Sequence, residues 1–190
     1  MHRWERKWLT AGPPHRAKAD ILNLETASLV ITLRPVDHAD IPQMAAIRAR
    51  EWKTEAFWID RIGLYLSGKH SPQQALSARA AFVATEGKEI VGFVAGHRTH
   101  RLGCSGELQW INVAEESRGH GIAGRLIAQI AIWFVGQDAS RVCVNVDPNN
   151  IAARKLYTRY GAEPLNEYWM VWENAHLMAA GRPAMSQRKP

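Results

Sequence analysis

The stretch from Val113 to Leu126 constrains this chain more than any other, because it places a glycine-rich and arginine-containing loop between a strand and a helix. The loop reads Arg-Gly-His-Gly-Ile-Ala-Gly over residues 118–124. The first turn of a helix has N–H groups without intrahelical partners, and glycines let an anion come close to them. With the positive end of the helix dipole added, the arrangement predicts a site for the phosphates of a cofactor.

Residues 119–124 also match the dinucleotide fingerprint G-x-G-x-x-G, and Asp147 lies near the place expected for a ribose-binding acid. Two observations oppose that interpretation. Five residues separate Val113 from Gly119, whereas the fingerprint needs its first glycine in the turn directly after the strand. Only 43 residues follow Asp147, too few for the rest of a doubly wound fold. A dinucleotide-binding oxidoreductase therefore remains only as an alternative.

A second motif, at residues 150–162, follows one strand after the loop. It resembles N-x-x-A-x-x-L-Y-x-x-x-G-[FA], while residues 118–123 fit [QR]-x-x-G-x-[GA]. In this order and at this spacing, the pair resembles the motifs of the GCN5-related N-acetyltransferase (GNAT) family. The resemblance covers residues 107–165 and extends over 29–172. It implies an α/β fold with a single mixed, largely antiparallel sheet flanked by helices, the GNAT or acyl-CoA N-acyltransferase fold.

The same resemblance implies an activity. A GNAT protein moves an acetyl group from acetyl-CoA, its cosubstrate, to a primary amine by direct attack in a ternary complex. No metal is expected, since the two cysteines do not have the spacing of metal ligands. A catalytically silent acyl-CoA-binding module of the same fold is the other alternative. The acceptor amine, either a small molecule or a peptide, stays open, as does the use of other acyl groups.

The expected cofactor site combines the loop, the strand before it and the helix of the second motif. The loop amides and the Arg118 side chain are expected to hold the phosphates. By resemblance, N–H groups at the end of the preceding strand pair with the pantetheine and the acyl oxygen, where that strand splays from its neighbour. The predicted cofactor-binding residues are Ile111, Asn112, Val113, Arg118, Gly119, His120, Gly121, Ile122, Ala123, Gly124, Asn150, Ala153 and Tyr157.

Two residues are predicted to be catalytic. Tyr157 falls on the tyrosine of the second motif, and a tyrosine hydroxyl is protonated at neutral pH and can donate to a departing thiolate. Glu107 begins the strand before the loop, where histone-acetylating members of the family keep a catalytic glutamate, so its carboxylate could accept the proton of the amine. Each has a structural alternative. Tyr157 could be a core residue, and Glu107 could form an ion pair with Arg98 or Arg101.

The acceptor pocket is expected between the segment 52–70, the strand ends near 97–107 and the last hairpin around Tyr168. His97 and His100 are reserve candidates for the base. The pocket would be rich in aromatic side chains, which usually pack in a core but here are numerous enough to favour a flat or partly apolar amine. These residues are Trp52, Phe57, Trp58, Tyr65, Trp110 and Trp169.

Apolar patterns predict the elements around these motifs. Asp40 and Asn150 are expected to cap two of the helices through their side chains. Strands are predicted over residues 29–33, 80–85, 89–95, 107–113, 141–146 and 167–172, and helices after Asp40, over 55–66, over 122–136 and after Asn150.

The net charge of +6 is concentrated at the two ends of the chain, since residues 1–20 carry +3 and residues 173–190 carry +2. A nucleic-acid-binding domain should instead carry its basic residues on a folded face, so nucleic acid is not an expected partner. No apolar run is long enough to span a membrane, and the first residues lack the apolar segment of a secretory signal. These features predict a cytoplasmic protein without a membrane partner.

A length of 190 residues fits one domain with a full core. We expect residues 29–173 to form the N-acetyltransferase domain. Residues 1–28 would be an N-terminal extension, which could support a homodimer, and residues 174–190 a flexible tail.

Overall fold

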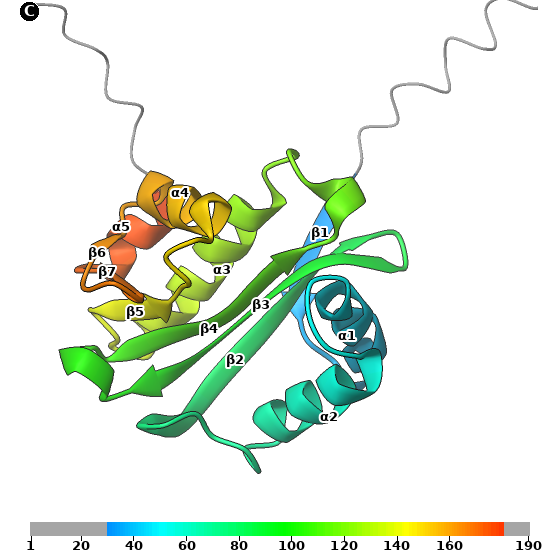
Figure 1. Ribbon diagram of the computed structural model, residues 1–190, viewed down its shortest axis with the longest axis horizontal. Helices are drawn as coiled ribbons and strands as arrows, with labels where there is room; N and C mark the ends of the chain where they lie inside the picture. Colours follow the sequence, from blue (N-terminus) through cyan, green and yellow to red (C-terminus); the bar gives the residue numbers. More distant parts are fainter. Residues whose placement is uncertain (1–29, 181–190) are drawn as a thin grey trace, which may run out of the picture. The chain divides into compact units, whose positions relative to one another are not determined.

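The computed structural model describes residues 30–180 of the chain (Figure 1). The predictions made for residues 1–28 and 181–190 lie outside the described residues. Within the described range, no helix is long and apolar enough to cross a membrane. The strands are β1 (Ile31–Pro35), β2 (Ala75–Glu86), β3 (Glu89–Thr99), β4 (Gly106–Val113), β5 (Val142–Asn145), β6 (Glu163–Pro164) and β7 (Trp169–Trp172), and the longer helices are α1 (Ile41–Ala49), α2 (Glu55–Leu66), α3 (Ile122–Gly136), α4 (Ile151–Arg159) and α5 (Ala175–Ala180).

The seven strands described form one sheet in the order β1-β2-β3-β4-β5-β7-β6. Neighbours are antiparallel except β4 and β5, which run parallel. The predicted α/β fold with a single mixed, largely antiparallel sheet is confirmed. A doubly wound dinucleotide fold needs a mostly parallel sheet, so the oxidoreductase alternative is wrong for this chain.

Helices cover both faces of the sheet (Figure 1). On one face α1 and α2 share a core with Val83 and Phe93 of the sheet. On the other face α3 and α5 share a core with Ala84 and Val94. Successive residues of β2 and β3 therefore enter opposite cores. This explains why both strands are apolar over consecutive residues rather than alternating.

A bulge in β4 separates two of its side chains. Ala95 of β3 lies opposite Trp110 and Gly96 lies opposite Leu108, so Gln109 is an extra residue without a counterpart. Trp110 enters the core beneath α1 and α2, whereas Leu108 enters the core beneath α3. In a regular strand, residues two apart share one face, so strict alternation would have placed both in the same core.

β4 pairs with its two neighbours over different lengths. With β3 it pairs from Gly106 to Val113, but with β5 only from Gly106 to Leu108. Beyond Leu108, the backbone groups of β4 that face β5 have no strand opposite them. Figure 1 shows β4 running on past the end of β5 toward the loop before α3. The splay that the family resemblance implied is present at this place.

Most predicted elements agree with the structure. The helix predicted over 55–66 is α2, with Thr54 as its N-cap, and the helix predicted over 122–136 is α3. The strand predicted over 29–33 instead spans Ile31–Pro35. Pro35 is tolerated because β1 is an edge strand, where a missing N–H need not be paired.

Asp40 does not cap α1 through its side chain, which corrects the prediction. A short 3-10 helix (His38–Asp40) comes first, and Asp37 caps it by accepting from the Ala39 N–H. The Asp40 carboxylate accepts hydrogen bonds from Arg34 at 2.6 and 2.8 Å and one from the Asp37 N–H at 2.7 Å. Because Arg34 binds it, the pKa of the Asp40 carboxyl lies below its usual value.

The folded part of the chain continues past residue 173, where the sequence predicted a flexible tail. α5 places Ala175 and Met178 in the core beside α3, and both are fully buried. The helix was missed because its apolar residues give no clear period over so short a stretch of six residues. β6 was missed for the same reason, since it has two residues.

Candidate functional site

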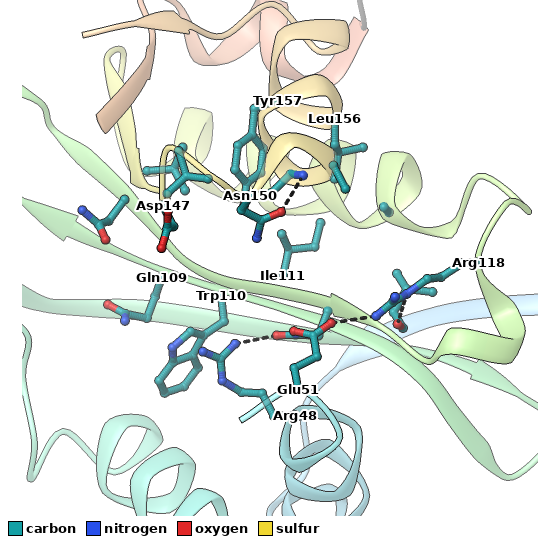
Figure 2. A pocket seen from close by; sticks show the side chains of 18 residues that line it. Arg48, Glu51, Gln109, Trp110, Ile111, Arg118, Asp147, Asn150, Leu156 and Tyr157 are labelled. Carbon is teal, nitrogen blue, oxygen red and sulfur yellow. Dashed lines mark hydrogen bonds and ion pairs between the residues drawn. The ribbon is translucent and has the colours of Figure 1, made fainter. Parts of the chain in front are cut away.

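A cavity of about 460 Å³ lies where β4 leaves β5. Residues 109–113 of β4 line one wall, and residues 144–147, at the end of β5, line the other. Figure 2 shows α1 with Arg48 on one side of this cavity and α4 with Tyr157 on the opposite side. Elements from both faces of the sheet therefore contribute side chains to a single space, called the first cavity below.

A second cavity, of about 380 Å³, lies against the loop before α3. Its lining comes from that loop, from the start of α3 and from α4. The two cavities adjoin, since they share the lining residues Val113, Arg118, Ala123, Ala152 and Leu156.

Two glycines shape the loop before α3. Gly119 and Gly121 have φ angles of 86° and 75°, in the left-handed region that favours glycine. A Cβ at either position would meet no atom within 4 Å, so both border open space. The first hydrogen bond of α3 runs from the Arg125 N–H to the Gly121 carbonyl, so the N–H groups of residues 122–124 have no partner one turn earlier in the helix. Donors at the positive end of α3 thus border the second cavity.

Gly124, the third glycine, is required by a neighbouring side chain. A Cβ at this position would lie 1.7 Å from the hydroxyl oxygen of Tyr160 and 2.5 Å from its Cζ. Tyr160 is the C-cap of α4 and lines the second cavity. Gly124 therefore lets α3 and the end of α4 approach closely beside the loop.

The two cavities bring together most of the predicted cofactor-binding residues. His120 is the exception: it lines neither cavity, is exposed, and has its Nδ1 atom 3.3 Å from the Ser117 carbonyl oxygen. The first cavity is lined by Ile111, Asn112, Val113, Arg118, Ala123, Asn150, Ala153 and Tyr157, and the second also by Gly119, Gly121, Ile122 and Gly124.

Tyr157 lies on the inner face of α4 and lines the first cavity (Figure 2). Its side chain is buried, with the ring packed edge-on against Trp172 at a centroid distance of 5.5 Å. Among the described residues, its hydroxyl has no hydrogen-bond partner. Burial raises the pKa of this hydroxyl, against a smaller opposing effect of the Arg48 charge. Tyr157 is therefore both a core residue and a protonated donor beside the cavity.

Asn150 caps α4 as predicted. Its Oδ1 accepts a hydrogen bond from the Ala153 N–H at 3.0 Å. Gly161, with φ of 89°, follows the other end of the helix. The cap fixes where α4 begins, and Tyr157 follows two turns later on the cavity side.

Glu107 lies outside both cavities and is buried. Its Oε2 accepts from Arg101 Nε at 3.1 Å and lies 3.6 Å from His97 Nε2. The other ring nitrogen of His97 is 3.1 Å from the Tyr65 hydroxyl. These four residues are called the buried polar cluster below. The ion pair that the sequence left open is present with Arg101, and the catalytic role of Glu107 stays a prediction.

Nothing in the described part of the chain resembles a metal site. No group of three or more His, Cys, Asp and Glu side chains there is arranged to hold an ion. The buried polar cluster has only Glu107 and His97 of these types, and Arg101 occupies the carboxylate.

Arg118 reaches from the loop to the end of α1. Its Nη2 donates to Glu51 Oε1 at 2.7 Å, and its Nε donates to the Val113 carbonyl at 3.2 Å (Figure 2). The other carboxylate oxygen of Glu51 accepts from Asn112 Nδ2 at 3.2 Å. The guanidinium is thus bound to a protein carboxylate. An anionic ligand that uses Arg118 would share its charge with that carboxylate or replace it.

Arg48 and Gln109 line the first cavity but were not predicted. Arg48 follows Met44 at helical spacing, so a charge on the apolar stripe of α1 was the available signal. Its Nη1 donates to Asn112 Oδ1 at 2.7 Å, and burial lowers the pKa of its guanidinium to about 10. Gln109 is the bulge residue of β4, and no sequence pattern marked the bulge.

Half of the six aromatic residues predicted for the acceptor pocket are buried core residues, and Trp169 is partly buried. Trp58, Tyr65 and Trp110 are buried between the sheet and the helices α1 and α2, while Trp52 and Phe57 are exposed. Of the six predicted, Trp110 is the one that lines the first cavity. The apolar character expected of the acceptor therefore loses its main support.

The mixed sheet, the divergence of β4 from β5 and the loop before α3 are the features that the resemblance to GNAT acetyltransferases implied. Residues 43–162 match the family model described as "Acetyltransferase (GNAT) family". The chain belongs to this family, and the resemblance stated from the two motifs is confirmed.

A curated relative extends this finding. Over 98 residues the chain is 33% identical to an L-2,4-diaminobutyric acid acetyltransferase of Methylotuvimicrobium alcaliphilum. The match covers 47% of this chain and 57% of the relative, so the chain spans little more than half of that protein's length.

Solved structures share the fold. The GNAT family N-acetyltransferase YhbS from Escherichia coli, solved in complex with CoA, has a TM-score of 0.59 at 20% identity, over 81% of this chain and 87% of that one. The PaiA N-acetyltransferase from Thermoplasma acidophilum, in complex with coenzyme A, has a TM-score of 0.55 at 11% identity, over 75% and 98% of the two chains. At such identities, these likenesses show the fold alone.

Proposed function

We propose that the protein is an acetyl-CoA-dependent N-acetyltransferase that acetylates a primary amine by direct attack in a ternary complex. The observation that carries the proposal is the first cavity, at the divergence of β4 and β5. Because elements from both faces of the sheet line it, two substrates can meet there. It also adjoins the free N–H groups at the start of α3.

The loop and the start of α3 fit the phosphates of coenzyme A. Gly119 and Gly121 border open space, and the N–H groups of residues 122–124 are available as donors. Hydrogen bonds to a charged group contribute about 1.5–3 kcal/mol each, so a few of them suffice as an anchor. Residues 111–113 of β4, whose β5-facing backbone groups lack a strand partner, would bind the pantetheine arm. The coenzyme A in the two related structures supports this assignment.

Two of the chemical tasks, polarising the acyl oxygen and protonating the leaving sulfur, then have a group beside the first cavity. Acetyl-CoA supplies the acetyl group as a thioester. The N–H groups near Ile111 and Asn112 would donate to the acyl oxygen as it gains negative charge. The Tyr157 hydroxyl would donate its proton to the departing sulfur. Burial, which raises the pKa of that hydroxyl, keeps it protonated at neutral pH.

The proton of the attacking amine needs an acceptor. Glu107 was predicted for this task, but its carboxylate binds Arg101 and does not line the cavity. We infer that the proton leaves to water in the cavity. The Glu107→Gln variant tests this inference against the prediction.

The acceptor amine is the part that family membership leaves open. The relative from Methylotuvimicrobium alcaliphilum is named for L-2,4-diaminobutyric acid, which makes that diamino acid the first amine to test. Peptides and polyamines belong in the same panel, because the GNAT fold alone does not select among amines.

Thiol release from acetyl-CoA tests the proposal. We expect acetyl-CoA, but not NADH, to raise the melting temperature, and at least one amine of the panel to release thiol together with an N-acetylated product seen by mass spectrometry. Stabilisation by acetyl-CoA without thiol release from any amine would favour the silent binding module. Absence of stabilisation by acetyl-CoA would contradict both functions.

A further inference from the structure

Two buried polar atoms without a partner belong to residues that line the first cavity. Among the described residues, three buried side-chain nitrogen or oxygen atoms lack a hydrogen-bond partner: Arg48 Nε, Gln109 Oε1 and His97 Nε2. His97 belongs to the buried polar cluster, but Arg48 and Gln109 both line the first cavity. Unsatisfied buried groups are costly, so their presence in one cavity points to a ligand that satisfies them.

The guanidinium of Arg48 is held in place by its neighbours, but no carboxylate in the described part of the chain is bound to it directly. Its guanidinium lies 4.0 Å from the ring centroid of Trp58 and 5.4 Å from that of Trp110, and Asn112 holds one of its terminal nitrogens. No carboxylate among the described residues forms a direct ion pair with it; the charge of Glu51 acts on it, but that carboxylate is bound to Arg118. A guanidinium that lines a cavity without a directly bound carboxylate can bind a planar anion there, such as the carboxylate of a ligand.

Gln109 offers the opposite chemistry. Its buried Oε1 is an acceptor, and it stands on the bulge of β4 that borders the same cavity. An amide oxygen without a partner accepts from an N–H group. Two residues that line the cavity therefore hold an unused donor, at Arg48, and an unused acceptor, at Gln109.

We propose that the acceptor of the acetyl group is an amine that also carries a carboxylate, as an amino acid does. Arg48 binds the carboxylate, and Gln109 accepts a hydrogen bond from an amino group of the same molecule. The inference rests on the proposed acetyl transfer and names the substrate class for it. Arg48 and Gln109 are then the residues that determine acceptor specificity.

Matched pairs of amines that differ by one carboxylate test this inference. Suitable pairs are L-2,4-diaminobutyrate with 1,3-diaminopropane, and L-ornithine with putrescine. For the wild type we expect kcat/KM of the amino acid to exceed that of its diamine by roughly tenfold to a hundredfold, the value of a charge-assisted hydrogen bond.

Two cavity variants separate the roles. Arg48→Met keeps a chain that packs on Trp58 but removes the charge, so the ratio of kcat/KM within each pair should fall close to one. Gln109→Met should lower kcat/KM for both members of a pair. Arg50→Met is the control, since Arg50 is two residues away, exposed, and paired with Glu116.

The outcomes distinguish the inference from the function on which it rests. Equal kcat/KM within every pair, or turnover only of amines without a carboxylate, would overturn the inference while leaving an acetyltransferase. A fall in acetyl-CoA affinity in Arg48→Met as large as the fall for the amino acid would assign Arg48 to the cofactor and also overturn it. If acetyl-CoA neither binds nor releases thiol with any amine, the proposed function itself fails. Should Arg48→Met not fold, the wild-type ratios and Arg48→Lys, which keeps the charge, still decide the matter.

Discussion

The first cavity and the buried polar cluster each contain a buried tyrosine. Burial raises the pKa of both Tyr157 and Tyr65. Tyr65 has a partner, since its hydroxyl lies 3.1 Å from His97 Nδ1, and it lines neither of the two cavities described above. Tyr157 has no such partner among the described residues and lines the first cavity. Burial and a raised pKa therefore do not distinguish a structural tyrosine, Tyr65, from a candidate catalytic one, Tyr157. What distinguishes them is that Tyr157 lines the first cavity.

Exchanging each tyrosine for phenylalanine is the strongest test of this contrast. Tyr157→Phe should lower kcat by about 10²–10⁴ if the hydroxyl protonates the leaving thiolate, with acetyl-CoA affinity little changed. Tyr65→Phe, the matched control, should leave kcat close to wild type and lower the melting temperature slightly. Normal turnover in Tyr157→Phe would mean that water is the proton donor.

The pH profile of kcat sharpens the same comparison. The protonated hydroxyl is the active form, and its pKa is raised, so activity should persist past the usual tyrosine value of about 10 and fall only at higher pH. This alkaline fall should be absent in Tyr157→Phe and preserved in Tyr65→Phe. Identical pH profiles of kcat in the two variants would contradict the assignment of Tyr157, and not Tyr65, as the proton donor.

A negative charge placed in the loop before α3 tests whether the phosphates of acetyl-CoA bind beside this loop. Gly121→Glu puts a carboxylate at the open position and repels phosphates, which should weaken acetyl-CoA binding by about a hundredfold or more if two charge-assisted hydrogen bonds are lost. Gly121→Ala is the control, because it shares the strain of a positive φ without the charge. Retained binding in Gly121→Glu, by calorimetry, would place the phosphates elsewhere.

Removing Arg118 should have a smaller effect. The guanidinium is half exposed and already bound to Glu51, so Arg118→Ala should weaken acetyl-CoA binding by about tenfold at most. Glu51→Gln, which releases Arg118 from its ion pair, should bind acetyl-CoA at least as tightly as the wild type. Tighter binding in Arg118→Ala than in the wild type would refute any role for its charge.

Glu107→Gln should have the smallest effect on turnover. The substitution keeps the shape but removes the charge that Arg101 binds, so the free energy of unfolding should fall by about 1–3 kcal/mol. We expect kcat, and the fall of kcat at low pH, to stay near wild type. A large decrease in kcat with loss of that pH dependence would instead make Glu107 the base.

The sequence located the backbone parts of the site better than its side-chain parts. Gly119, Gly121 and Asn150 were found because a left-handed turn and a helix cap each demand particular residues at fixed offsets. Arg48 lies 61 residues before Gln109, and only the packing of α1 on the sheet brings both to one cavity. No local rule contains that information.

The bulge in β4 explains another failure of sequence reasoning. The alternation of side chains along a strand assigns residues to the two faces of the sheet correctly only while every residue has one residue opposite it on the neighbouring strand. Gln109 interrupts it, so the face of each β4 residue before the bulge is reversed relative to those after it. The divergence of β4 from β5 came from family resemblance and not from the residues themselves.

Gly124 and Tyr160 constrain each other as this chain evolves. A Cβ at residue 124 would lie 1.7 Å from the Tyr160 hydroxyl oxygen, so alanine there requires the tyrosine side chain to move. Phenylalanine at 160 in the same position gives little relief, because the ring carbon Cζ would still be 2.5 Å away. A lineage that has first accepted a smaller residue at 160 is therefore freer to vary residue 124 than one that keeps the tyrosine. Retention of this glycine would then reflect the packing of a tyrosine as well as the shape of a cofactor site.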